Sequence, residues 1–332
     1  MQNSAEDFKH LLLDCQIPKL DQELMGLCEG KITENECCEV LKTMNNDKSP
    51  GNDGIPAEFY KHFWSFLKSS MVQSFNYSYD NNLLSTSQRQ AVVTLLERKN
   101  SDRTDLKNWR PISLLNVDYK IMSKVIAFLP SIISPCQTGY VQDRYIGEAV
   151  RLIEDVMNSA DEEQIPGLIL FLDFEKAFDS IDWDFLLSTM TTFGFGPSIL
   201  KWFKLFYNDV SSCIVNNGFS SNYFKIQRGV RQGDPLSPYL FILGAEILSR
   251  MIMNNDNIKG IKINREVKLV QFADDTTVFM KDLDSTKEVF RTLDLFEKVS
   301  GLKINYNKTE AIWIGTEKYS TEKPFGINWL KK

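Results

Sequence analysis

The chain has 332 residues, 43% apolar and 25% charged, a composition that suits a globular protein with a sizeable core and excludes a largely disordered chain. Its six cysteines contain no C-x-x-C pair and only two histidines are present, so a zinc site built on these residues is not expected. The net charge of −6 argues, at first sight, against a nucleic-acid partner.

The charge is unevenly distributed along the chain. Residues 1–66 hold 6 basic and 12 acidic side chains, which accounts for the whole negative excess. Residues 98–124 instead hold 7 basic and 3 acidic side chains and begin with Arg98-Lys99. Such a basic segment could face phosphate groups, although a solvated loop would have the same composition.

No targeting or membrane-spanning segment is recognisable in the sequence. The first residues are polar and lack the basic start of a secretory signal, and no apolar run reaches the length that spans a bilayer. We therefore expect an intracellular protein without membrane contact. The sequence does not distinguish between nucleus and cytoplasm, and it does not identify a protein partner.

Residues 1–46 carry leucines at mixed helical spacing, which predicts a helical extension. Within them, Thr33 and Glu36 form a capping-box pattern that predicts the start of a helix. A loop rich in turn-forming residues follows at 48–56, and a helical pattern with breaks continues over 57–79.

Two short apolar runs, 91–96 and 109–115, predict an antiparallel pair of strands joined by a basic loop. Helices are expected after them, over 117–128 and 147–158. The continuous apolar run 168–172 predicts a strand that is buried on both faces and that ends at an aspartate.

The later elements alternate between helices and strands. Asp182 is expected to cap a helix that Gly194 ends, and Ser285 with Glu288 predicts a capping box for another helix. The other elements expected are a helix from Pro197, a strand and turn over 213–219, a helix over 236–251, a hairpin over 270–279 and a last strand over 309–314. This order indicates an α+β fold, with a small antiparallel sheet and helices packed on one face, related to the split βαβ plan.

The hairpin carries two adjacent carboxylates, Asp274 and Asp275, between apolar arms. Turns favour one aspartate, but two like charges about 4 Å apart repel by roughly 1 kcal/mol in water and about 4 kcal/mol at an effective dielectric of 20. A cation would offset this repulsion, and oxygen-only ligation suits Mg²⁺; a plain acidic hairpin is the alternative. Asp173, at the end of its buried strand, would complete a site for two Mg²⁺ ions if the two strands pair.

Four stretches resemble, in order, motifs A to D of reverse transcriptases: LDFEKAFD (172–179), GVRQGDPLSP (229–238), FADD (272–275) and GLKINYNKTE (301–310). Upstream, three more resemble the fingers motifs of non-LTR, LINE-class retrotransposons: KSPGNDG (48–54), NWRPISLLN (108–116) and QTGYV (137–141). Seven motifs in family order make the resemblance specific, and it covers the chain from residue 48 to about 314.

The resemblance implies a right-hand polymerase with fingers and palm. The expected parts are a helical N-terminal extension (1–46), fingers (47–166), a palm built on the small antiparallel sheet (167–316) and a short tail (317–332). No thumb is recognised. The helix near Phe128 also runs straight into Pro130, where the family has more residues.

The resemblance also implies the catalytic residues. Asp173 and Asp274 would bridge two Mg²⁺ ions, which Mn²⁺ could replace, with Asp275 as a third carboxylate. Lys308 matches the motif-D lysine proposed to protonate the pyrophosphate leaving group, although a plain surface lysine is the alternative.

Four further residues match positions that contact the incoming nucleotide. Arg110 matches a fingers arginine on the triphosphate, where a bidentate guanidinium fits. Phe178 matches the ring that excludes a ribose 2′-hydroxyl, with a core aromatic as the alternative. Gln232 and Gly233 match the loop along the nucleotide, where glycine allows close approach and glutamine both donates and accepts.

The implied function is that of an RNA-directed DNA polymerase, which extends a DNA primer on an RNA template with deoxynucleoside triphosphates by two-metal phosphoryl transfer. A non-enzymatic, decayed retrotransposon fragment is the alternative, because a missing thumb and shortened fingers would weaken the grip on the duplex. A metal-dependent nuclease would instead require His or Glu ligands near the acids and would lack the Gln-Gly loop.

Overall fold

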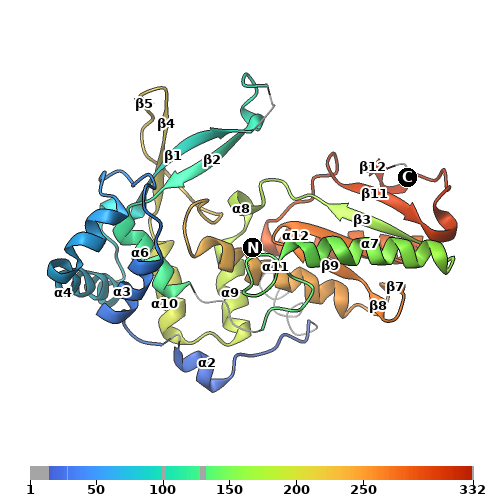
Figure 1. Ribbon diagram of the computed structural model, residues 1–332, viewed down its shortest axis with the longest axis horizontal. Helices are drawn as coiled ribbons and strands as arrows, with labels where there is room; N and C mark the ends of the chain where they lie inside the picture. Colours follow the sequence, from blue (N-terminus) through green and yellow to red (C-terminus); the bar gives the residue numbers. More distant parts are fainter. Residues whose placement is uncertain (1–14, 28, 99–101, 128–131, 331–332) are drawn as a thin grey trace. The chain divides into compact units, whose positions relative to one another are not determined.

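The computed structural model describes residues 15–27, 29–98, 102–127 and 132–330 (Figure 1). The predictions for residues 1–14, for Lys99 and for the shortened segment 128–130 lie outside the described residues. The chain forms two compact units. The first unit is Met1–Lys19, Leu129–Phe193 and Leu240–Lys332, and the second unit is Leu20–Phe128 and Gly194–Tyr239.

The second unit opens with two short helices, α2 (Gln22–Leu27) and α3 (Glu34–Thr43), and the second begins after Thr33 as predicted. The backbone leaves helical geometry between them, where Gly30 has a φ of +112°. The capping box is confirmed, because the hydroxyl of Thr33 accepts the N–H of Glu36 and the Glu36 carboxylate accepts the N–H of Thr33.

α4 (Ala57–Asn81) runs for 25 residues without the breaks that the sequence suggests. Tyr60, Val72 and Phe75 are buried along it, so packing keeps the helix continuous. It ends at Asn82, whose left-handed backbone is a common helix stop. The other helices of this unit are α5 (Thr86–Arg89), α6 (Val117–Ile126), α10 (Pro197–Phe206) and the 3₁₀ turn η1 (Leu106–Asn108).

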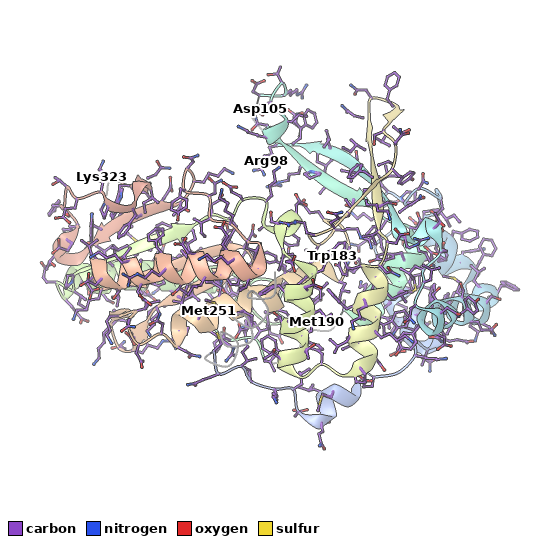
Figure 2. The ribbon with its side chains drawn as sticks, turned by 180° about the vertical axis from the view of Figure 1, so that it is seen from behind. Arg98, Asp105, Trp183, Met190, Met251 and Lys323 are labelled. Atoms are coloured by element: carbon purple, nitrogen blue, oxygen red, sulfur yellow. The ribbon has the colours of Figure 1, made fainter. Side chains whose placement is uncertain are left out.

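The sheet of the second unit is built on the predicted antiparallel pair, β1 (Gln90–Glu97) and β2 (Trp109–Leu114), which is confirmed. Figure 2 shows Arg98 and Asp105 near the outer end of this hairpin. β4 (Ser211–Asn216) runs parallel to β1 on its other edge, and β4 pairs in turn with β5 (Phe219–Ser220) and β6 (Phe224–Lys225). The strand predicted at 213–219 therefore belongs to this sheet and not to the sheet of Asp173.

The boundaries of the two compact units differ from those of the fingers and palm expected from the sequence. Residues 129–166, in the expected fingers, lie in the first unit, and Gly194–Tyr239, in the expected palm, lie in the second. The second difference follows from the pairing of β4 with β1, since pairing between strands distant in sequence is not visible in local patterns.

The first unit contains the sheet that ends at Asp173, with strand order β12-β11-β3-β10-β9. β3 (Gly167–Leu172) lies in the middle, antiparallel to β10 (Asp275–Met280) and to β11 (Glu310–Ile314). β9 (Leu269–Phe272) and β10 form the predicted hairpin, and β12 (Asn328–Trp329) adds a parallel edge strand that the sequence does not predict. The small, mainly antiparallel sheet is confirmed.

Helices cover both faces of this sheet, and not one face as the element order suggests. α7 (Ile146–Glu162) runs along the sheet and packs against Phe279 on one face (Figure 1). α11 (Ser237–Met253) reaches the other face, where the hydroxyl of Ser249 donates to the side chain of Gln271. Strand alternation points Gln271 and Phe279 to opposite faces, so the sheet is the middle layer of three.

α9 (Trp183–Phe193) begins as predicted, because the carboxylate of Asp182 accepts two N–H groups of its first turn. It ends at Gly194, whose φ of +84° is left-handed. Figure 2 shows Trp183 and Met190 along this helix.

α12 (Leu283–Ser300) begins earlier than predicted, and the capping box at Ser285 and Glu288 is wrong. The N-cap is Asp282, whose carboxylate accepts the N–H of Ser285 at 2.8 Å, so Ser285 is already inside the helix. The predicted stop at Gly301 is confirmed.

The remaining elements of the first unit are short: α8 (Ala177–Ser180), β7 (Ile261–Lys262), β8 (Glu266–Val267), η2 (Gly315–Glu317) and η3 (Pro324–Gly326). Within the described ranges, no helix combines the length and the apolar character needed to cross a lipid bilayer.

We predict that Gly315→Ala strongly destabilises the first unit. Gly315 has a φ of +61°, and a Cβ on it would lie 1.7 Å from the carbonyl oxygen of Ile165. Gly326 has a similar φ of +63° but nothing within 4 Å of that position. Gly315→Ala should lower the free energy of unfolding by about 3 kcal/mol or more, and Gly326→Ala by about 1 kcal/mol, because only the first adds a clash to backbone strain. Urea unfolding measures both losses, and equal losses would contradict the prediction.

Candidate active site

The register between β3 and β10 brings the predicted acids to one end of the sheet. Leu172, the last residue of β3, pairs with Thr276, so the next residues along the two strands are Asp173 and Asp275. Asp274 directly precedes Asp275 in the hairpin turn, where Ala273 adopts a left-handed φ of +56°. One strand end and one hairpin turn therefore present three carboxylates together.

Their electrostatic interaction appears in the pKa values. Burial raises the pKa of Asp274, and repulsion from Asp275 and Asp173 raises it further. Burial also raises the pKa of Asp275, with a second contribution from Asp173. A raised folded-state pKa means that the ionised form is disfavoured in the fold, so these groups lower stability at neutral pH and cease to do so once protonated.

Asp173 is held by its backbone, which leaves its carboxylate available. Its N–H donates to the hydroxyl of Thr309 at 3.3 Å, and its carbonyl accepts the N–H of Asn305 at 2.8 Å. Its carboxylate oxygen Oδ2 is buried and accepts no hydrogen bond from the described residues. A buried carboxylate oxygen without a donor normally has a cation or a water as its partner.

Lys308 lies beside this oxygen, with its Nζ 4.0 Å from Asp173 Oδ2. The lysine side chain is 61% exposed, so the ion pair contributes at most about 1 kcal/mol to stability. The backbone N–H of Lys308 donates to the carbonyl of Asn305, in the same turn that binds the backbone of Asp173. The turn therefore fixes the backbone of Lys308, while its amine lies on an exposed side chain.

The donor set fits a divalent cation of the hard, oxygen-preferring type. The three acids supply only oxygen atoms, Asp173 Oδ2 has no donor, and both hairpin acids have raised pKa values that a cation would lower. In the described part of the chain, no three acidic, cysteine or histidine side chains are already arranged to hold a metal ion. Binding would therefore require the carboxylates to turn towards a common point.

Phe178, on α8, is held by an aromatic partner that is distant in sequence. Its ring stacks on Phe241 of α11, with centroids 4.8 Å apart and planes at 11°. Phe241 is fully buried, whereas Phe178 is half-buried. Stacking on a buried ring fixes the plane of Phe178 and leaves part of it accessible, which suits both the steric-gate and the core interpretation.

The other nucleotide-contact candidates lie in the second unit, where Arg110 is exposed on β2. The loop of Gln232 and Gly233 is bonded to the same strand, since the carbonyl of Gln232 accepts the N–H of Ser113 at 2.8 Å. A Cβ on Gly233, whose φ is +109°, would lie 2.7 Å from the carbonyl oxygen of Ser113. Glycine is therefore required for this close approach of two backbones.

Three buried polar side chains that were not predicted from the sequence, Arg231, Tyr119 and Asp234, anchor both sides of this loop. Arg231 donates to the hydroxyl of Tyr119 at 2.8 Å, and that hydroxyl donates to Asp234 at 2.9 Å. All three side chains are almost fully buried, and the Arg231 guanidinium also lies over the Tyr119 ring. Burial raises the pKa of Tyr119, so it stays a neutral donor at physiological pH.

The candidate residues thus form two groups. Asp173, Phe178, Asp274, Asp275 and Lys308 lie in the first unit, and Arg110, Gln232 and Gly233 lie in the second. A signal for the missed anchors exists in the sequence, since Arg231 and Asp234 directly flank the Gln-Gly pair. Tyr119 and Phe241 carry no such signal, because they are distant in sequence from the residues that they hold.

Comparison with known proteins gives one matching family model and several relatives. The model for "Reverse transcriptase (RNA-dependent DNA polymerase)" matches residues 98–327. The "Transposon TX1 uncharacterized 149 kDa protein" of Xenopus laevis is 31% identical over 326 residues, which cover 95% of this chain and 25% of that protein.

Two more relatives come from other mobile elements. A "Retrovirus-related Pol polyprotein from type-1 retrotransposable element R2" of Popillia japonica is 26% identical over 67% of this chain and 32% of its own length. The "RNA-directed DNA polymerase from mobile element jockey" of Drosophila melanogaster is 22% identical over 82% of this chain and 30% of its own length. The chain therefore spans between a quarter and a third of these relatives.

The family match covers more than half of the chain and includes every candidate site residue. Reverse transcriptases as a family depend on divalent metal ions, which agrees with the oxygen donors gathered at Asp173. The chain belongs to the reverse transcriptase (RNA-dependent DNA polymerase) family, and its relatives place it with the proteins of non-LTR, LINE-class retrotransposons.

Proposed function

We propose that this chain is a catalytic reverse transcriptase domain, which extends the 3′-hydroxyl of a DNA primer along an RNA template with deoxynucleoside triphosphates. The observation that carries the proposal is the register of β3 with β10, since it sets Asp173 beside Asp274 and Asp275. We assign the fingers to residues 47–166 and the palm to 167–316 as functional subdomains.

Mg²⁺ is the proposed metal: Asp173 and Asp274 would hold two ions, with Asp275 as the third carboxylate. Bound Mg²⁺ ions would activate the primer hydroxyl and neutralise charge on the transferred phosphate. Oδ2 of Asp173 accepts no hydrogen bond from the described residues, which supports this assignment, because a metal ligand needs a free lone pair.

The remaining candidates are assigned to nucleotide binding and proton transfer. Lys308, with its amine 4.0 Å from Asp173, would donate a proton to the pyrophosphate leaving group. Arg110 would bind the triphosphate, and the loop of Gln232 and Gly233 would lie along the nucleotide. Phe178 would exclude a ribose 2′-hydroxyl by the edge of its ring.

The alternative is a decayed, non-enzymatic fragment of a retrotransposon protein. The three acids, the Gln-Gly loop and Lys308 are all present, and one relative is named as an RNA-directed DNA polymerase, which favours the enzyme. A nuclease is disfavoured further, since neither His10 nor His62 lies within the sequence motifs that carry the acids.

Primer extension separates these alternatives. The purified chain should extend oligo(dT) on poly(rA) in Mg²⁺ and should not cleave the template. A folded protein that neither extends nor cleaves would support the decayed fragment. Cleavage without extension would support the nuclease.

Asp274→Asn should abolish extension, by at least about 1,000-fold, without loss of stability. The substitution removes a metal ligand, worth several kcal/mol in the transition state, and also removes repulsion among the acids. In EDTA at pH 7 the variant should be as stable as the wild type or up to about 1 kcal/mol more stable. The difference should vanish on acidification, as the raised pKa of the wild-type carboxyl is passed and it becomes neutral.

Thermal unfolding from pH 4 to 8 tests the stability part of this prediction. Asp256→Asn is the control, because Asp256 is an exposed acid of the same unit outside the site. A variant that is less stable than the wild type at pH 7 in EDTA would show that Asp274 is not under repulsion.

Phe178→Val should admit ribonucleotides and raise the ratio of ribonucleotide to deoxyribonucleotide incorporation by at least about 10-fold. A smaller side chain would leave room for the 2′-hydroxyl, while the ring of Phe241, on which Phe178 stacks, would stay in place. Phe185→Val is the matched control, since Phe185 is a buried core ring of the same unit. If Phe178→Val lowers stability as Phe185→Val does and leaves sugar selection unchanged, Phe178 is a core residue.

A further inference from the structure

The turn that carries Asp274 is not stable by itself. Ala273, the residue before Asp274, has a φ of +56°, and a residue with a Cβ adopts this conformation only at a cost of about 1–2 kcal/mol. The turn is also buried at Ala273, so the N–H and carbonyl of this residue need partners within the protein. Both requirements point to a group that holds the turn from outside the hairpin.

Gln137 supplies that group. Its side-chain oxygen Oε1 accepts the N–H of Ala273 at 2.9 Å, and its Nε2 donates to the carbonyl of the same residue at 3.3 Å. Oε1 also accepts the N–H of Gly139 at 2.9 Å. A flipped amide would direct its NH₂ group at two N–H donors, so the bonding pattern fixes the orientation of this amide. Gln137 is 1% exposed, so solvent cannot replace these bonds.

The backbone around Gln137 is bonded to the hairpin as well. The N–H of Thr138 donates to the carbonyl of Gln271 at 2.8 Å, and the N–H of Gln271 donates to the carbonyl of Cys136 at 2.7 Å. A Cβ on Gly139 would lie 2.4 Å from the nitrogen of Ala273. We call residues 132–139 the strap; it lies against the hairpin at contact distance.

The strap is itself anchored, which makes it a firm support. Arg144 donates to the carbonyl oxygens of Ile133, Ser134 and Gln137. The buried carboxylate of Glu246, on α11, accepts both the N–H and the hydroxyl of Ser134. The strap is therefore fixed to a core helix at one end and by an arginine along its length.

We infer that Gln137 is a positioning residue that clamps the Ala273 turn and thereby sets the carboxylate of Asp274 for metal binding. The inference rests on the proposed function, because it assigns Asp274 to the metal. Without the clamp, the turn would lose both bonds and relax from the left-handed conformation. The repulsion among the three acids would then drive Asp274 away from Asp173.

The test compares Gln137→Met with Gln88→Met in the full chain. Methionine keeps the length of the side chain and removes its hydrogen bonds. Gln88 is also a buried glutamine, at 5% exposure, but it bonds Ser85 and Asp118 and not the hairpin. Three quantities are measured: hydrogen exchange of the peptide 269–280 in EDTA, Mn²⁺ binding by electron paramagnetic resonance, and the Mg²⁺ concentration for half-maximal primer extension.

For Gln137→Met we expect exchange in 269–280 to accelerate by at least about 10-fold, and Mn²⁺ affinity and Mg²⁺ requirement to worsen by about 10-fold, as for other groups that orient metal ligands. Gln88→Met should lower the unfolding midpoint and leave all three quantities unchanged. If both variants differ from the wild type only in unfolding midpoint, the inference that Gln137 clamps the turn is wrong.

A second variant covers the case in which Gln137→Met does not fold. Gln137→Glu keeps an oxygen that can accept the N–H groups of Ala273 and Gly139, but it cannot donate to the Ala273 carbonyl and it adds a negative charge next to Asp274, so exchange in 269–280 should accelerate by at least about 3-fold. Exchange as slow as in the wild type would overturn the inference. If the wild type does not extend primers, the proposed function fails, while exchange and Mn²⁺ binding still decide whether Gln137 is a clamp.

Discussion

The repulsion among three carboxylates is the constraint on which the rest of the first unit depends. Burial raises the pKa values of Asp274 and Asp275, and the negative charge of Asp173 raises both further. A flexible loop would relieve such repulsion by moving apart. Here the acids are attached to the two most constrained places in the sheet, the end of its central strand and a tight hairpin that pairs with that strand.

The three-layer packing is what makes this attachment rigid. β3 is buried, α7 packs against one face of its sheet, and the buried hydrogen bond from Ser249 of α11 to Gln271 ties a second helix to the hairpin strand on the other face. A sheet covered on both faces buries apolar side chains on each of them. This burial stabilises the fold by about 25 cal/mol per Å² of apolar surface removed from water. The hydrophobic core thus supplies the free energy that holds like charges together until a cation binds.

Local features of the fold could be predicted from the sequence, and long-range pairings could not. The hairpin 270–279, the strand before Asp173 and the capping box at Thr33 depend on residues within one element, and all three are present. The start of α12 shows the limit even locally, since Asp282 and Ser285 are both good caps and only the backbone decides between them. The pairing of β4 with β1 depends on residues more than a hundred positions apart, for which local patterns hold no signal. The site follows the same rule: its acids are visible in the motifs, whereas the supporting roles of Gln137, Tyr119 and Phe241 become visible only through their contacts.

The chemical type of the clamp follows from the same repulsion. The group that holds the Ala273 turn must both accept from its N–H and donate to its carbonyl, which a carboxylate or an ammonium group cannot do alone. A carboxylate would add a fourth negative charge next to Asp274, and a lysine or arginine would neutralise Asp274 permanently and compete with the metal ion. A primary amide is neutral and carries both functions in one plane, so glutamine can fix the turn without changing the charge that the metal site requires.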